Sequence, residues 1–266
     1  MIAFFFRKPL LLLLLLLPAA VCAAEPVPGL TVAEHPWGRF AAKSWCRLQT
    51  TVWTNQDNKQ TVSYQESLTT LESVEKDGLT FKETLNIALG GKWVENPPLV
   101  KRFDFYQEPI LDSVKVQTGK PEKRIIGNTV VPCGVRIYEQ TGTAGKRTTT
   151  VWYSRQIFPY VLRTSSVLRS IPTEKEPEEK IIDQTVTEVT ETSAFSLWKS
   201  RRGTYHLRTT QKSGSITFIT ETDCSLHIPG GVIRKTTREL DKNGKELRLL
   251  DTRLINFFVI PEPVVF

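Results

Sequence analysis

Residues that could do chemistry are few and scattered along the chain. Asp104 and Glu108 lie four residues apart and could act as an acid and a base, but nothing else in the sequence distinguishes this pair. There is no Gly-x-Ser-x-Gly nucleophile motif and no glycine-rich phosphate-binding loop. The histidines are His35, His206 and His227. The sequence therefore predicts no catalytic residue and no cofactor, and an enzyme is the less favoured class.

Cys224 and His227 form the one pair with a spacing that suggests metal ligands. Side chains three positions apart on a strand point to opposite faces, so only a bend could bring these two together. There is no C-x-x-C or H-E-x-x-H pattern, and we expect structural residues here with no metal. An oxidising compartment would allow one disulfide and one spare thiol among Cys46, Cys133 and Cys224, and the pairing stays open.

Residues 1–23 have the pattern of a secretory signal peptide. Arg7 and Lys8 precede an unbroken run of leucines, Leu10–Leu17, and small residues follow it. The apolar run is shorter than the roughly 20 residues that a membrane-spanning helix needs. We expect an exported product, periplasmic or extracellular, with no stable membrane span after cleavage. An uncleaved anchor and a lipidated Cys22 are the alternatives.

The net charge does not indicate a nucleic-acid-binding protein. Loss of residues 1–23 removes Arg7 and Lys8 and lowers the formal charge from +7 to +5. Binding of nucleic acid requires such charge to be gathered on one face. The densest basic cluster has alternating positions that favour a solvated sheet edge: Lys199, Arg201, Arg202, His206 and Arg208.

The pattern of the mature chain is that of β-strands joined by short turns. About a dozen segments combine β-branched and aromatic residues with period-two alternation. Asp77-Gly78 and Asn243-Gly244 are strong hairpin signals. Short turns make neighbouring strands antiparallel, and the long strands favour a large curved sheet over a sandwich. The predicted fold is all-β, half-barrel-like, with few or no long helices.

We expect a flexible leader at residues 24–36 and a single β-rich domain at 37–266. The proline-spaced, charged stretch 170–180 is a surface loop, or alternatively a hinge between two lobes. Residues 96–122 are the least readable part, and a short helix near Glu108 lacks a cap. Strand register, and therefore the choice of the concave face, stays open.

A strand–turn–strand pattern occurs between Gly127 and Arg169. Tyr153-Ser154 is followed after four residues by Pro159, and then by Leu162-Arg163. This pattern resembles the middle of the LolA/LolB-like (lipoprotein-carrier) half-barrel superfamily. Pro229-Gly230-Gly231-Val232 near the C-terminus is similar to a motif in secreted bacterial proteins of unknown function.

The resemblance implies a curved sheet whose concave face holds an acyl chain or a lipoprotein. The carrier superfamily closes that face with helices, and no amphipathic helix is evident in this sequence. The first functional hypothesis is accordingly a non-catalytic module that binds a lipid-like or other apolar ligand. The alternative is an envelope or extracellular structural protein that interacts through its surface and sheet edges. A continuously apolar concave face would favour the first hypothesis.

Overall fold

A computed structural model describes residues 27–56, 59–89, 91–172, 174, 178–192 and 203–260. The expected signal peptide lies outside these residues. The described part contains a short 3-10 turn, η1 (Val32–Glu34), and the strands β1 (Trp45–Gln56), β2 (Lys59–Val74), β3 (Leu79–Leu89), β4 (Lys92–Glu95), β5 (Leu99–Phe103), β6 (Val114–Thr118), β7 (Glu122–Ile126), β8 (Thr129–Gly142), β9 (Gly145–Tyr153), β10 (Val161–Arg169), β11 (Ile181–Thr192), β12 (Thr204–Ser213), β13 (Ile216–Ser225), β14 (Val232–Leu240) and β15 (Glu246–Phe258).

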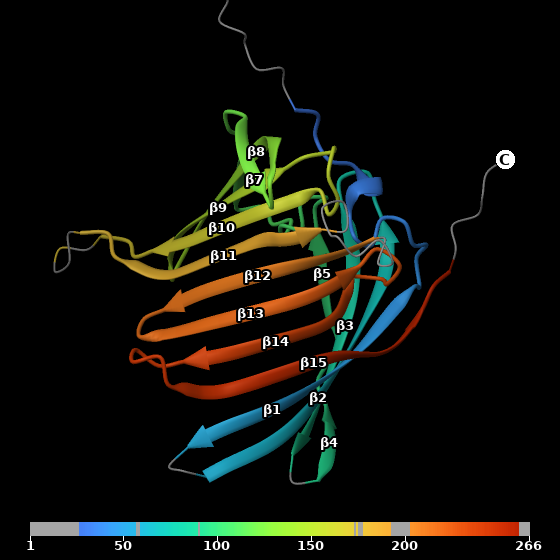
Figure 1. The fold of residues 1–266 in the computed structure, drawn as a ribbon, viewed down its shortest axis with the longest axis vertical. Coiled ribbons are helices and arrows are strands. Elements are labelled where there is room, and N and C mark those ends of the chain that lie inside the picture. The colour runs from blue at the N-terminus through green and yellow to red at the C-terminus, as the bar shows by residue number, and fades with distance from the viewer. Residues whose placement is uncertain are drawn as a thin grey trace, which may run out of the picture.

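The strands form one open antiparallel sheet that curves strongly (Figure 1). Its order is β4-β3-β2-β1-β15-β14-β13-β12-β11-β10-β9-β8-β6, with β5 also paired to β3 and β7 to β8. The first and last strands, β1 and β15, pair with each other inside the sheet rather than at its edges. The all-β, half-barrel-like prediction is therefore confirmed. No helix in the described residues is long and apolar enough to cross a membrane.

Strand register assigns each side chain to one face of the sheet. Thr164 lies opposite Val151 and Thr187, so these three side chains share a face. Trp152 and Arg163 pair with each other and point to the opposite face. The face of Val151 is the inner, concave one, because the segments that cross the molecule pack against it.

Two segments cover one end of the inner face. The crossing segment, residues 104–113, runs from β5 at one sheet edge to β6 at the other. The N-terminal residues 27–44 lie beside it, and the Leu30 amide donates a hydrogen bond to Tyr106 Oη at 3.0 Å. Both segments contribute to buried clusters on the inner face: Leu30, Tyr106, Tyr138, Val151 and Tyr153 in one, and Trp37, Cys46, Leu71, Leu79 and Phe81 in the other.

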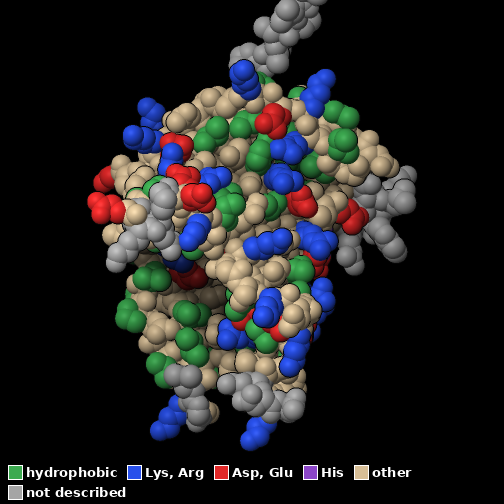
Figure 2. Space-filling model, turned by 90° about the vertical axis from the view of Figure 1, so that its left-hand side faces the viewer, with side chains coloured by type: hydrophobic (Ala, Val, Ile, Leu, Met, Phe, Trp, Pro, Cys, Tyr) green, Lys and Arg blue, Asp and Glu red, His purple; other side chains and the backbone are tan. Residues whose placement is uncertain are grey.

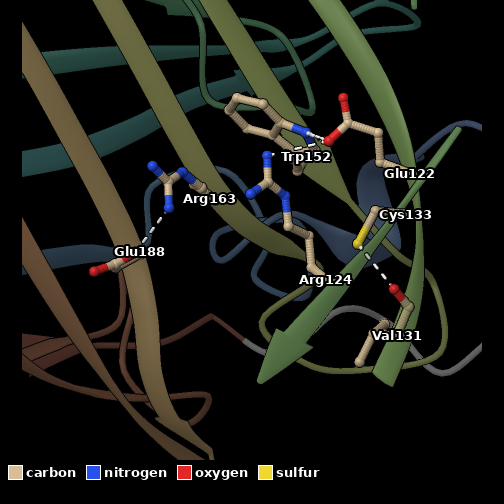
Figure 3. Close-up of polar contacts among 7 residues, drawn as sticks. All are labelled: Glu122, Arg124, Val131, Cys133, Trp152, Arg163 and Glu188. Atoms are coloured by element: carbon tan, nitrogen blue, oxygen red, sulfur yellow. Dashed lines mark hydrogen bonds and ion pairs between the residues drawn. The ribbon is translucent and has the colours of Figure 1, made fainter. Parts of the chain in front are cut away.

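The outer face carries its own cover where the β7–β8 hairpin folds over Trp152 (Figure 3). Trp152 Nε1 donates to Glu122 Oε2 at 2.8 Å, and the Arg124 guanidinium lies 4.3 Å from the indole centroid. Arg163 pairs with Glu188 beside this stack at 3.0 Å. Trp152 is thus held by a hydrogen bond, a cation–π contact and burial. Its indole therefore has a structural role on the outer face.

The structure differs from expectation near the N-terminus. Residues 30 to 36 of the expected flexible leader are packed, because Leu30, Glu34 and His35 are buried. Glu34 also pairs with Arg155 at 2.7 Å. Residues 96–122, whose structure the sequence pattern did not predict, contain β5, β6 and the crossing segment, and no helix is described there. Residues 170–180 connect β10 to β11, which are neighbours in the sheet.

Gly230 sits where both its backbone and its surroundings exclude a side chain. Its φ is +75°, and an added Cβ would lie 2.9 Å from Trp37 Nε1. Gly244 has a similar φ of +80° but an open surrounding. We expect Gly230→Ala to lower the melting temperature more than Gly244→Ala does. Both substitutions put alanine in a strained left-handed conformation, but only the one at Gly230 also displaces Trp37. Equal losses in thermal unfolding would contradict this packing.

Candidate ligand-binding groove

The middle of the inner face is lined by hydroxyl groups. At one register level, five adjacent strands each place a threonine on this face: Thr237, Thr220, Thr209, Thr187 and Thr164. Within this threonine row, Thr220 and Thr237 share a hydrogen bond of 2.9 Å, as do Thr187 and Thr209. Hydroxyls that are bonded in pairs retain spare donor or acceptor capacity for a further partner.

The other side of the inner face carries a group of apolar side chains beside polar ones such as Glu83 and Lys101. Register places Leu85 and Ile87 of β3, Val94 of β4 and Leu99 of β5 on the same face as the threonine row. Val94 and Leu99 are 46% and 59% exposed, so this apolar wall is open to solvent. Figure 2 shows hydrophobic side chains gathered beside the hollow in the molecule. The concave face is therefore not continuously apolar, and a polar wall faces an apolar one.

Two cavities lie between the crossing segment and the hydroxyl-lined strands. The larger has a volume of about 410 Å³, and the smaller, of about 190 Å³, shares Glu108 and Thr164 with it. The larger cavity combines apolar residues of the crossing segment with polar residues of the sheet: Glu108, Pro109, Leu111, Val114, Tyr138, Gln140, Arg147, Thr149, Thr164, Ser166 and Thr185. We call these two cavities together the groove.

Asp104 fixes the shape of the crossing segment above the groove. Its carboxylate accepts hydrogen bonds from the backbone amides of Tyr106 and Glu108 at 2.9 and 3.0 Å, and from the Tyr138 hydroxyl. Gln107, between them, has a φ of +69°. Burial raises the pKa of Asp104, although these hydrogen bonds oppose the rise. The carboxylate thus ties a turn of the crossing segment to β8.

Glu108 faces the groove without a hydrogen bond from its side chain to another described residue. Burial raises its pKa to about 7, the Asp104 charge adds to the rise, and Arg147 opposes it. Such a carboxyl can exchange a proton near neutral pH. A two-carboxylate mechanism would need a second acid in the same place, but Asp104 is occupied by its own donors. The arrangement suits binding better than acid–base catalysis.

The three histidines lie apart from one another and away from the larger cavity. His35 is buried against Phe81, and burial lowers its pKa to about 4. His206 lies on the outer face between Asp223 and Glu221, at 3.0 and 2.8 Å. Burial would lower the pKa of His206, but the hydrogen bonds to both carboxylates outweigh it and raise the pKa. His227 lies in the turn after β13.

Cys224 and His227 are the candidate pair with metal-ligand spacing. In the part of the chain that the structure describes, no three potential ligands are grouped to hold an ion. Cys224 is buried beside Tyr205, which its thiol contacts. The other cysteines lie in different clusters, Cys46 near Trp37 and Cys133 near Trp152.

We expect all three thiols to be free and slow to react. Cys46, Cys133 and Cys224 are unpaired and buried, and burial raises their pKa values to about 12, 11 and 12. Because the thiolate is the nucleophile, alkylation of the folded protein at pH 8 should be at least ~100-fold slower than in urea. Mass spectrometry after timed alkylation measures this. Fast labelling of the folded protein, or a disulfide between two of them, would be inconsistent with the structure.

Sequence reasoning did not find the threonine row or Arg147. Alternating hydroxyls are visible in the sequence at Thr164 and Ser166 and again at Thr185 and Thr187. Alternation places each pair on one face, but it does not say whether that face is concave. The candidate pair Asp104 and Glu108 lies in the crossing segment, which covers the groove.

These features define an open antiparallel half-barrel with a groove on its inner face. Similar solved structures include a protein described as an outer membrane lipoprotein-sorting domain from Vibrio parahaemolyticus (9% identity, TM-score 0.34, covering 88% of this chain and 93% of that one). A LolA superfamily protein from Nitrosomonas europaea has 9% identity and a TM-score of 0.31, covering 88% and 96%. An exported protein with a YmcC-like fold from Bacteroides fragilis has 9% identity and a TM-score of 0.29, covering 82% and 98%.

These distant likenesses accompany an open half-barrel architecture that the strand order of this chain shows by itself. No protein-family model matches the sequence, and no curated protein matches it significantly. What the groove binds must be argued from the residues of this chain.

Proposed function

We propose that this is an exported, non-catalytic binding protein for a lipid-like, amphipathic ligand held on the inner face of the sheet. The observation that carries the proposal is the division of that face into a threonine row and an apolar wall. An alkyl chain gains roughly 0.8 kcal/mol for each methylene group that it buries against the apolar wall. The paired threonine hydroxyls keep spare donor or acceptor capacity that a hydrocarbon cannot fill, which favours a ligand with polar groups.

The groove also offers a defined place for the polar part of the ligand. Its floor brings Thr149, Thr164 and Ser166 together with the amide of Gln140. Its roof is Pro109 and Leu111 of the crossing segment, which contribute apolar surface on one side. The lining of this cavity is mostly polar, with apolar residues on the crossing segment, which suits the polar part of an amphipathic ligand.

The test is competitive displacement of a fluorescent fatty acid from the mature protein. A monoacylglycerol and an alkane of equal chain length are compared as competitors. We expect saturable displacement by the monoacylglycerol and at least ~10-fold weaker displacement by the alkane, because only the former satisfies the hydroxyls. Equal displacement would indicate a purely apolar site, and failure of the fluorescent probe and both competitors to bind would contradict the proposed function.

A second candidate function is interaction with an envelope protein through the sheet edges. Large apolar side chains are exposed there: Trp93 on β4 (53%), Val100 on β5 (70%), and Ile125 (73%) and Val130 (59%) on the β7–β8 hairpin. Unpaired edges can accept a strand from a partner. Crosslinking in cells with a photoreactive residue at position 93 tests this, with Lys59 in the β1–β2 turn region as the control position. The same adducts at both positions would count against an edge-specific partner.

A further inference from the structure

The larger cavity contains two opposite charges that do not pair. Glu108 enters it from the crossing segment, and Arg147 enters it from β9. Arg147 Nη1 donates to Ser166 Oγ at 3.2 Å, and no ion pair joins Arg147 to Glu108 among the described residues. Elsewhere on the same strands the charges do pair, as Lys146 does with Glu139 at 3.2 Å.

The two charges are held apart by the elements that carry them. The Asp104 hydrogen bonds hold the backbone of Glu108, and Arg147 is held to the sheet by Ser166. A half-buried carboxylate and a half-buried guanidinium that face the same cavity are each stabilised by an oppositely charged partner, because burial removes part of their hydration. The cavity of about 410 Å³ between them has room for such a partner.

We propose that the polar group of the ligand is zwitterionic, with an ammonium at Glu108 and a phosphate or carboxylate at Arg147. This inference rests on the proposed function, since it names the head group of the lipid-like ligand. Guanidinium groups bind phosphate and carboxylate through paired N–H donors, and a carboxylate accepts from an ammonium. The Gln140 amide and the Thr149 hydroxyl line the same cavity and can complete the contacts.

The charges around Glu108 predict how binding changes with pH. Burial raises the pKa of Glu108 to about 7, Asp104 on its own segment adds to the rise, and Arg147 from β9 opposes it. From β10 and β11, Arg163 and Glu188 border the adjoining cavity, but their side chains point to the outer face and pair with each other. An ammonium binds the ionised carboxylate, so affinity should rise from pH 6 to pH 8 as Glu108 loses its proton, and flatten above that.

The experiment measures displacement of the fluorescent fatty acid from the mature protein by three lipids with identical acyl chains. These are a phosphatidylethanolamine, an anionic phosphatidylglycerol and an uncharged diacylglycerol. We expect the phosphatidylethanolamine to bind at least ~10-fold more tightly than either of the others. Glu108→Gln should remove that preference over diacylglycerol and the rise with pH. Arg147→Gln should weaken both phospholipids and spare the diacylglycerol.

The control is Lys146→Gln, which removes the neighbouring charge on the outer face and should change none of these affinities. Circular dichroism confirms that each variant is folded. Equal binding of the three lipids by the wild type would overturn the zwitterion inference while the proposed function stood. Binding of none of them, nor of the probe, would overturn the proposed function itself. Free phosphoethanolamine that competes as well as the lipid would support the zwitterion but contradict a lipid-like ligand.

Discussion

Thr164→Trp should reduce ligand binding by at least ~100-fold. Thr164 lines both cavities and therefore sits at the point where the groove is continuous. An indole in place of the small side chain would fill much of the smaller cavity, of about 190 Å³, and remove a hydroxyl from the threonine row. Overpacking of a preformed site costs typically 1–3 kcal/mol, to which the lost contacts of the displaced ligand add. Displacement of a fluorescent fatty acid measures the loss.

The matched control is Ser165→Trp, one residue further along β10. Ser165 pairs with Thr150 and Val186, so its side chain points to the outer face. We expect Ser165→Trp to keep wild-type affinity, provided that its thermal unfolding shows a folded protein. If both substitutions weaken binding equally, or if neither does, the ligand does not occupy the inner face at this level.

Asp104→Ala should destabilise the protein and disorder the roof of the groove. The substitution leaves the Tyr138 hydroxyl and the amides of Tyr106 and Glu108 without their acceptor. Groups that lose a buried partner cost about 1–3 kcal/mol each, so we expect a loss of roughly 3–5 kcal/mol in the free energy of unfolding. Denaturant titration measures this, and ligand affinity should fall with it.

Two further substitutions separate the possible causes. Asp112→Ala changes an exposed carboxylate in the same segment and should be neutral within about 0.5 kcal/mol. Asp104→Asn keeps an oxygen that can accept from the two backbone amides, but it loses the acceptor for Tyr138 and removes the charge that adds to the pKa rise of Glu108. Its stability should lie between those of the wild type and Asp104→Ala, with the pKa of Glu108 below 7. A wild-type stability for Asp104→Ala would show that the crossing segment is held by other contacts.

Much of the fold could be predicted because its determinants are local. Asp77-Gly78 lies in the short connection from β2 to β3, and Asn243-Gly244 lies in that from β14 to β15, so both hairpin signals predicted real hairpins. Alternation within each segment predicted strands, and short turns predicted antiparallel neighbours. The stretch Gly127–Arg169 does contain all of β8, β9 and β10.

What could not be predicted depends on contacts between residues far apart in the sequence. The pairing of β1 with β15 joins Trp45 to Phe258, and no local pattern specifies such a partner. The threonine row exists only once five strands are in register, because a shift of one residue would send each hydroxyl to the outer face. The crossing segment has no periodic pattern of apolar residues. The structural role of Asp104 depends on a hydrogen bond from Tyr138, which lies 34 residues away in the sequence.

Native mass spectrometry of the mature protein, purified from its own periplasm or medium, tests the central claim most directly. If the inner face holds a lipid-like ligand, the spectrum should show a bound mass of phospholipid size that disappears after organic extraction. Refolded Thr164→Trp protein incubated with the extract should fail to regain that mass, whereas refolded wild type should regain it. A bare wild-type protein before extraction, which also fails to take up any component of a whole-envelope lipid extract, would contradict the account.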